Sequence, residues 1–191
     1  MMRKLIGLVL IAAAAPLLQA CFPLAVTGVG AAALMASDRR TTGMYIEDEG
    51  IEWKVVARLR DGFRGAHVNA TSFNRRVLLT GEAPDEEAKK GIEEAVRGIP
   101  NVKEVTNEMQ VAGASSLASR GNDALVTSNV KARMVNNGKF SPQHVKVITE
   151  AGVVYLMGIV SPQEGDAAVE ITRTTSGVNR VVKVFEYVGN K

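Results

Sequence analysis

The spacing of hydrophobic residues in the second half of the chain predicts a helix followed by two strands. Val126, Val130 and Met134 recur every fourth residue, which is the pattern of a helix with one buried face over residues 122–137. Residues 144–149 then alternate between hydrophobic and polar positions, as a strand does. The predicted strands are residues 144–149 and 153–160, joined by a hairpin turn at Glu150-Ala151-Gly152 in which Gly152 can adopt positive φ.

A second helix and a third strand complete this half. Ser161-Pro162-Gln163-Glu164 is typical of a helix start, because serine caps the first turn, proline fits its first position and glutamate can close a capping box. This helix is expected to run to about residue 176 and to end at Gly177. Residues 180–187 form the last predicted strand. The order is therefore helix, strand, strand, helix, strand.

The first half of the chain repeats this order at an offset of 75–77 residues. Val77-Leu78-Leu79-Thr80-Gly81 aligns with Val154-Tyr155-Leu156-Met157-Gly158, and His67-Val68 aligns with His144-Val145. Three strands with one polar face need a cover on the other, so each copy is expected to be an α+β two-layer sandwich of a three-stranded sheet and two helices. The predicted helices of this copy are 48–60 and 85–97, and its strands are 66–73, 76–82 and 102–111.

These elements divide the chain into two tandem domains. The first domain is predicted at 44–112 and the second at 122–191, with a small, polar linker at 113–121.

The N-terminus has the pattern of a bacterial lipoprotein signal. Arg3 and Lys4 precede an apolar run at residues 5–15 that is too short to span a bilayer. Leu18-Gln19-Ala20-Cys21 then resembles a lipobox, which predicts a signal peptide at 1–20, acylation (palmitate) at Cys21 and a tether over 21–43. A single acyl chain binds a protein to a membrane only marginally, whereas the three acyl chains of such a lipoprotein would anchor it firmly.

The residue after the cysteine indicates the membrane. Lipoproteins kept at the inner membrane usually carry aspartate there, so Phe22 favours the periplasmic face of the outer membrane.

Charge is divided unevenly between the two copies. Residues 44–112 hold 10 Lys and Arg against 13 Asp and Glu, a net of −3, whereas residues 120–191 hold 9 against 6, a net of +3. Either the halves attract each other or the asymmetry marks a partner surface. The formal net charge of +3 includes Arg3 and Lys4, so the basic character is a poor argument for nucleic-acid binding.

The repeated order, the V-x-L-x-G pattern of the second strand and the closing Gly177-Val178-Asn179-Arg180-Val181 resemble the BON domain, named for bacterial OsmY and nodulation proteins. The first copy departs from this pattern in having Asn101 where the second has Gly177. The resemblance implies a non-enzymatic periplasmic protein that maintains outer-membrane integrity. It also implies binding of anionic phospholipid through the second BON domain and accumulation at division sites.

The first helix of the second copy is the candidate lipid site. On a helical wheel, Leu125 and Val135 fall away from the Val126 stripe, and cations lie nearby for headgroup phosphates. The alternative is that Leu125 and Val135 pack against the first copy. Trp53 also faces outward, and packing between the domains is expected for it rather than lipid contact. The predicted phospholipid-binding residues are Leu125, Ser128, Lys131, Ala132, Arg133 and Val135.

No pattern of catalytic residues stands out. His67 and His144 occupy equivalent strand starts, which a repeated fold explains, and no Cys or His cluster has the spacing of a zinc site. Glu47-Asp48-Glu49 and Asp85-Glu86-Glu87 are expected to be solvated residues at helix starts. We therefore expect no enzymatic activity, no cofactor and no metal. The rival function is an adaptor that binds an envelope assembly protein through the acidic first domain or an exposed strand edge.

Overall fold

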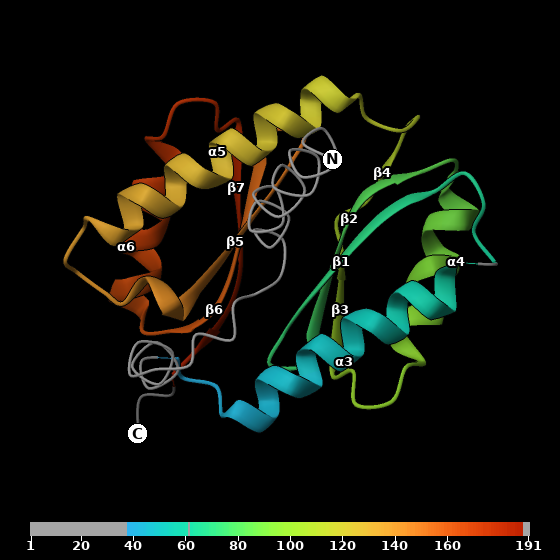
Figure 1. Ribbon diagram of the computed structural model, residues 1–191, viewed down its shortest axis with the longest axis horizontal. Helices are drawn as coiled ribbons and strands as arrows, with labels where there is room; N and C mark the ends of the chain where they lie inside the picture. Colours follow the sequence, from blue (N-terminus) through green and yellow to red (C-terminus); the bar gives the residue numbers. More distant parts are fainter. Residues whose placement is uncertain (1–37, 61, 189–191) are drawn as a thin grey trace, which may run out of the picture. The chain divides into compact units, whose positions relative to one another are not determined.

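The computed structural model of the chain describes residues 38–60 and 62–188 (Figure 1). The predicted signal peptide, Cys21 and most of the predicted tether lie outside the described residues. Residues 35–191 belong to one compact unit with its own hydrophobic cores, as expected of a part that folds by itself. No helix among the described residues is both long and apolar enough to cross a membrane.

Both copies have the predicted order of elements. In the first, helix α3 (Thr42–Leu59) leads into strands β1 (His67–Phe73) and β2 (Arg76–Ala83), then helix α4 (Glu86–Arg97) and strands β3 (Glu104–Asn107) and β4 (Gln110–Val111). In the second, helix α5 (Leu117–Val135) and the short 3-10 helix η2 (Pro142–His144) precede strands β5 (Val145–Glu150) and β6 (Val153–Val160), helix α6 (Pro162–Arg173) and strand β7 (Arg180–Tyr187). The predicted α+β fold is confirmed.

The two sheets share one topology. The first two strands form an antiparallel hairpin, and the strand after the second helix pairs parallel to the central strand, giving the orders β1-β2-β3 and β5-β6-β7. The hairpin turns are two residues long and use positive φ throughout, at Asn74-Arg75 and at Ala151-Gly152. The capping box predicted at Ser161 and Glu164 is present.

The motif glycine of each central strand is required by a close backbone approach. A Cβ at Gly81 would lie 2.1 Å from the carbonyl oxygen of His67, and a Cβ at Gly158 would lie 2.1 Å from that of His144. The departure at Asn101 has a similar backbone explanation. Asn101 and Gly177 both have positive φ, which asparagine tolerates better than most residues.

Several predicted boundaries are corrected, and α6 ends at Arg173 rather than near residue 176. Helix α3 begins at Thr42 rather than residue 48, and α5 begins at Leu117, inside the predicted linker, because Thr41 and Ser116 cap them. The added turn of α3 lacks the buried stripe on which the prediction relied. The predicted strand 102–111 is split into β3 and β4, because the Asn107 side chain accepts the backbone N–H of Met109 at 3.2 Å.

The central strand of each sheet, β2 or β6, is buried on both faces. One face packs under the helices of its own copy, forming separate cores around Ile51 and Val55 and around Val126 and Val130. The other faces of the two sheets pack against each other and form a third hydrophobic cluster with residues from both copies. Its members are Phe73, Leu78, Val153, Tyr155, Met157 and Val184. The expectation of one polar face per sheet is therefore wrong, because each copy covers the second face of the other.

We predict that Gly158→Ala strongly destabilises the fold. The new methyl group would collide with main-chain atoms of His144, which cannot rotate away, so the loss should be about 1–3 kcal/mol or more. Gly50→Ala is the matched control, since nothing lies within 4 Å of a Cβ there and alanine favours helix. Urea unfolding of both variants measures the difference. Equal stabilities would contradict the close-approach explanation.

Candidate membrane-docking site

Helix α5 is fixed to the second sheet by a buried apolar stripe and by one buried acid. Val126, Val130 and Met134 are almost completely buried, as predicted. One turn earlier, the carboxylate of Asp123 accepts the backbone N–H groups of Ala151 and Gly152 at 2.9 and 2.8 Å. The acid thus ties the helix to the β5–β6 turn, whose backbone N–H groups point away from any strand partner.

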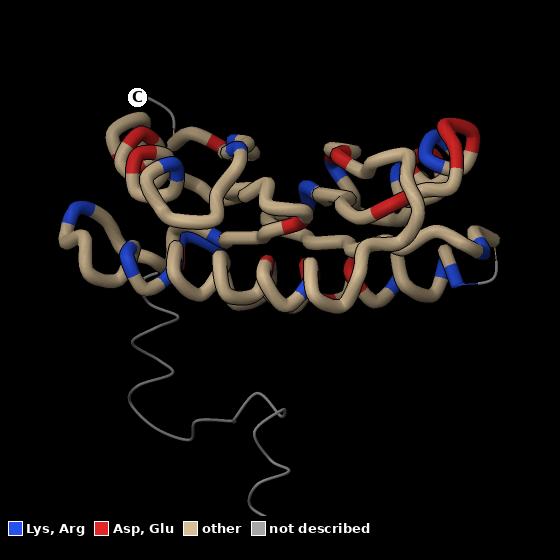
Figure 2. Tube along the Cα trace, turned by 90° about the horizontal axis from the view of Figure 1, so that it is seen from above, with Lys and Arg blue, Asp and Glu red and all other residues tan. Residues whose placement is uncertain are grey.

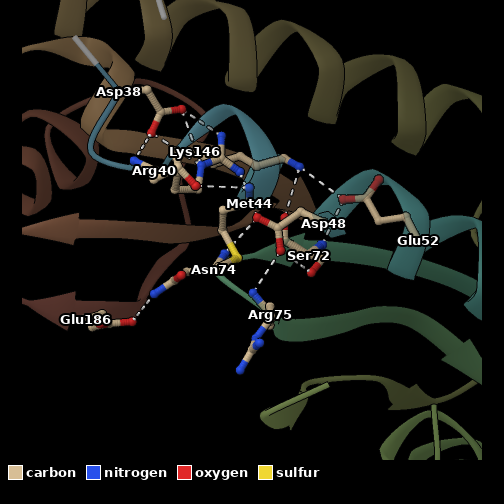
Figure 3. Close-up of polar contacts among 11 residues, drawn as sticks. Asp38, Arg40, Met44, Asp48, Glu52, Ser72, Asn74, Arg75, Lys146 and Glu186 are labelled. Atoms are coloured by element: carbon tan, nitrogen blue, oxygen red, sulfur yellow. Dashed lines mark hydrogen bonds and ion pairs between the residues drawn. The ribbon is translucent and has the colours of Figure 1, made fainter. Parts of the chain in front are cut away.

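Asp48 does the same in the first copy (Figure 3). Its carboxylate accepts the Ser72 hydroxyl and the backbone N–H groups of Asn74 and Arg75, each at 2.8 Å, and pairs with Arg40 at 3.0 Å. Asp48 is only 2% exposed, so its prediction as a solvated residue at a helix start is wrong. The sequence does hold a signal for this burial, because Asp48 and Asp123 each stand three residues before the first buried apolar residue of their helix stripe.

The opposite face of α5 is open to solvent. Leu125 and Val135 are both 66% exposed, so the alternative that they pack against the first copy is wrong. Ser128, Lys131 and Ala132 are exposed on the same helix. All six predicted lipid-binding residues, Arg133 included, are thus exposed side chains that a membrane could reach.

Arg133 is placed differently from the other five. Its guanidinium donates to the carbonyl of Ile171 at 2.8 Å and to the hydroxyls of Thr174 and Thr175 at 3.0 and 2.6 Å. These groups belong to the C-terminal end of α6, where a positive charge is favourable. Arg133 therefore joins α5 to α6 and is not a free cation for headgroups.

Lys131 borders a groove of ≈ 380 Å³ together with Arg40 and Lys146. Arg40 pairs with Asp38 and Asp48 and stacks 4.0 Å from the centre of the Phe73 ring, while Lys146 pairs with Glu52 at 3.1 Å (Figure 3). Lys131 has no hydrogen bond or ion pair within the described part of the chain. Among these three cations, it is the one available to an anionic ligand.

The charge on α5 differs from that on the other α-helices. Among the described α-helices, α5 alone holds more basic residues than acidic ones, and its single acid, Asp123, is buried. Figure 2 shows basic and acidic positions interspersed over the described trace, so this positive charge is local.

Trp53 lies on the outer face of α3, and its side chain is 73% exposed. The predicted packing of Trp53 between the domains is therefore wrong. Ile46 and Val56 are exposed on the same helix. This apolar face lies on an acidic helix, which distinguishes it from the face of α5.

The residues before α3 are tied to both copies. Arg39 donates to Glu164 of α6 at 2.7 and 3.0 Å and to the carbonyl of Ile159, while Arg40 binds Asp48 of α3. Desolvation raises the pKa of Glu164, but hydrogen bonds from Arg39, the Ser161 backbone N–H and His144 outweigh it and lower the pKa to about 2.

The family model of the BON domain matches residues 47–113 and 122–189, which together make up most of the chain. The chain belongs to the BON domain family. The two matched segments correspond to the two copies of the fold, so the resemblance seen in the sequence is confirmed.

Three relatives carry the comparison further. The chain is 38% identical over 174 residues to the outer membrane lipoprotein DolP of Haemophilus influenzae, covering 90% of both chains. It is 34% identical to a 21 kDa hemolysin of Actinobacillus pleuropneumoniae, covering 79% of each chain. It is 30% identical to osmotically-inducible protein Y of Escherichia coli, covering 76% of this chain and 75% of the relative. The first relative agrees with the predicted outer-membrane location, and none of the three names denotes an enzyme.

We predict that Glu164→Gln destabilises the protein in a pH-dependent way. The folded-state pKa of Glu164 lies below its ordinary value of 4.5, so the charged network stabilises the fold above about that pH and loses this contribution as the pH falls toward 2. Glutamine keeps the capping box, so the loss of about 1–3 kcal/mol at pH 7 reports the charge. Urea unfolding at a series of pH values measures it.

The control is Glu170→Gln on the same helix. Its carboxylate pairs with Arg173, and both side chains are mostly exposed, so stability should change little. A Glu164→Gln deficit that stays constant from pH 7 to below pH 3 would contradict the assignment.

Proposed function

We propose that this protein is a lipid-anchored periplasmic component of the outer membrane whose second BON domain docks on anionic phospholipid. The observation that carries the proposal is the outer face of α5, where exposed Leu125 and Val135 flank Lys131, a cation without a partner among residues 38–60 and 62–188. Apolar tips enter the acyl edge of a bilayer while a cation meets phosphate. Acylation at Cys21 supplies the permanent anchor, and maintenance of outer-membrane integrity is the role.

We propose a smaller docking set than the one predicted from the sequence. Leu125, Ser128, Lys131, Ala132 and Val135 remain, and Arg133 supports the site by holding α5 against α6. Lys131 and Val135 also border the groove beside Lys146, so a headgroup bound at Lys131 would lie at its rim.

The second candidate function is the protein adaptor. Exposed Ile46, Trp53 and Val56 on acidic α3 favour it, because an apolar face among acids suits a protein partner better than an anionic membrane. Trp53 is the only tryptophan of the chain, so its fluorescence reports on this face alone. Docking through α5 should leave the Trp53 emission unchanged when vesicles are added.

We predict that Lys131→Glu weakens binding of residues 35–191 to phosphatidylglycerol vesicles by about tenfold or more. Each cation near an anionic surface contributes about 1 kcal/mol, and charge reversal replaces attraction with repulsion. Leu125→Ser should weaken binding several-fold by removing apolar area. Co-sedimentation measures both, and wild-type binding should fall with added salt and be weak on neutral phosphatidylcholine.

Two matched controls lie in the first domain. Lys90→Glu reverses an exposed charge on α4, and Val56→Ser removes an exposed apolar side chain from α3. Both should bind like the wild type. If Lys131→Glu and Lys90→Glu weakened binding equally, α5 would not be the docking helix. If Val56→Ser weakened binding and Trp53 emission shifted, α3 would be the docking helix instead.

A further inference from the structure

Three metal-ligating side chains from three strands meet where the two domains pack together. His67 begins β1, Glu82 lies near the end of β2, and Glu150 ends β5 of the other domain. The ligand atoms of all three lie within 4.8 Å of one another, and Nδ1 of His67 is 2.9 Å from Oε2 of Glu82. Tetrahedral ligands about 2.0–2.2 Å from a zinc ion lie roughly 3.3–3.6 Å apart, so small side-chain adjustments would bring these three donors onto one ion.

The register of the first hairpin builds this cluster. His67 lies directly opposite Glu82, and Asn69 lies directly opposite Thr80. Side chains two residues apart share a face of a strand, so both pairs project from the same side of the sheet, the side that carries Leu78 of the interdomain cluster. The two domains thus form the cluster jointly, with two ligands from one and the third from the other.

Glu150 is held in place by residues of the first domain. Its Oε2 accepts the Asn69 amide at 2.8 Å and the Thr80 hydroxyl at 3.3 Å. No hydrogen bond to Oε1 is found among the described residues, so this oxygen remains for a ligand. Polar neighbours that orient a ligating carboxylate are typical of metal sites.

The two acids of this cluster have no lysine or arginine partner among the described residues. Glu82 and Glu150 are 7% and 9% exposed, and within residues 38–60 and 62–188 neither forms an ion pair with a lysine or arginine. The equivalent pair in the second domain is different, because Glu164 beside His144 also binds Arg39. Buried carboxylates are normally paired or bound to metal, so the first pair lacks the cation that the second has.

An ion can reach the cluster from solvent. A groove of ≈ 600 Å³ is lined by His67, Asn69 and Glu150 together with residues of α5. The donor set, one imidazole nitrogen and two carboxylates, suits zinc better than magnesium or calcium, which prefer oxygen alone.

We propose that His67, Glu82 and Glu150 bind a Zn²⁺ ion that joins the two BON domains. The ion neutralises the two buried carboxylates and adds ligand bonds across the domain interface. Water completes its coordination from the groove. Zinc then stabilises the packing of the two domains against each other independently of lipid binding.

Zinc titration of the full-length protein in detergent tests the proposal. The wild type should bind one Zn²⁺ per chain by calorimetry, with a melting temperature that rises with zinc concentration. Co²⁺ in its place should give visible absorption bands. Glu150→Gln, which keeps an oxygen acceptor for Asn69 and Thr80, and His67→Gln should each weaken zinc affinity at least about tenfold.

His144→Gln is the matched control, because it removes the equivalent histidine of the second domain and should leave zinc affinity unchanged. Circular dichroism confirms that each variant is folded. Zinc binding that is equal in all three variants, or absent from the wild type, would overturn the proposal. Equal loss in His67→Gln and His144→Gln would do so as well, since it would indicate binding to any exposed imidazole.

Discussion

Burial of the second face of each sheet is the constraint on which the rest of this structure depends. Two helices can cover only one face of a three-stranded sheet, and the other face of β6 is as apolar as the first. Leu78, Tyr155 and Met157 are almost completely buried between the sheets. Each domain therefore completes the core of the other, and duplication of the domain provides the cover that one copy lacks.

This packing also explains why polar chemistry collects at the edge of the interface. Where the apolar cluster ends, side chains of one domain meet those of the other, as Lys146 meets Glu52 and Asn74 meets Glu186. The His67 cluster lies at such an edge. The helices are thereby left free on their outer sides, so α5 can present Leu125 and Val135 without weakening either core.

The sequence predicts strands and helix faces well where one periodic stripe is buried. Residues 153–160 and 180–187 are strands to the residue, and Val126, Val130 and Met134 form the core stripe of α5. The helix starts at Thr42 and Leu117 are not predicted, because the N-cap residues Thr41 and Ser116 determine them and no buried stripe marks them.

The candidate site also has some features that the sequence predicts and others that depend on tertiary contacts. Exposure of Leu125 and Val135 follows from their helical phase, whereas the contact of Arg133 with α6 depends on tertiary structure. The unbroken apolar run of β6 does indicate burial on both faces, a signal that alternation alone does not give. Glu150 reaches His67 only because the domains pack together, so no spacing in the sequence could reveal their proximity.

The attachment of residues 38–40 has a mechanical consequence. Arg39 forms an ion pair with Glu164 of the second domain, and Arg40 forms one with Asp48 of the first. Force drawn through the chain from its N-terminal side would load the Arg39–Glu164 pair and then the Arg40–Asp48 pair before it reached either hydrophobic core. A pull from this side would thus act on both domains before it acted on the apolar packing between them.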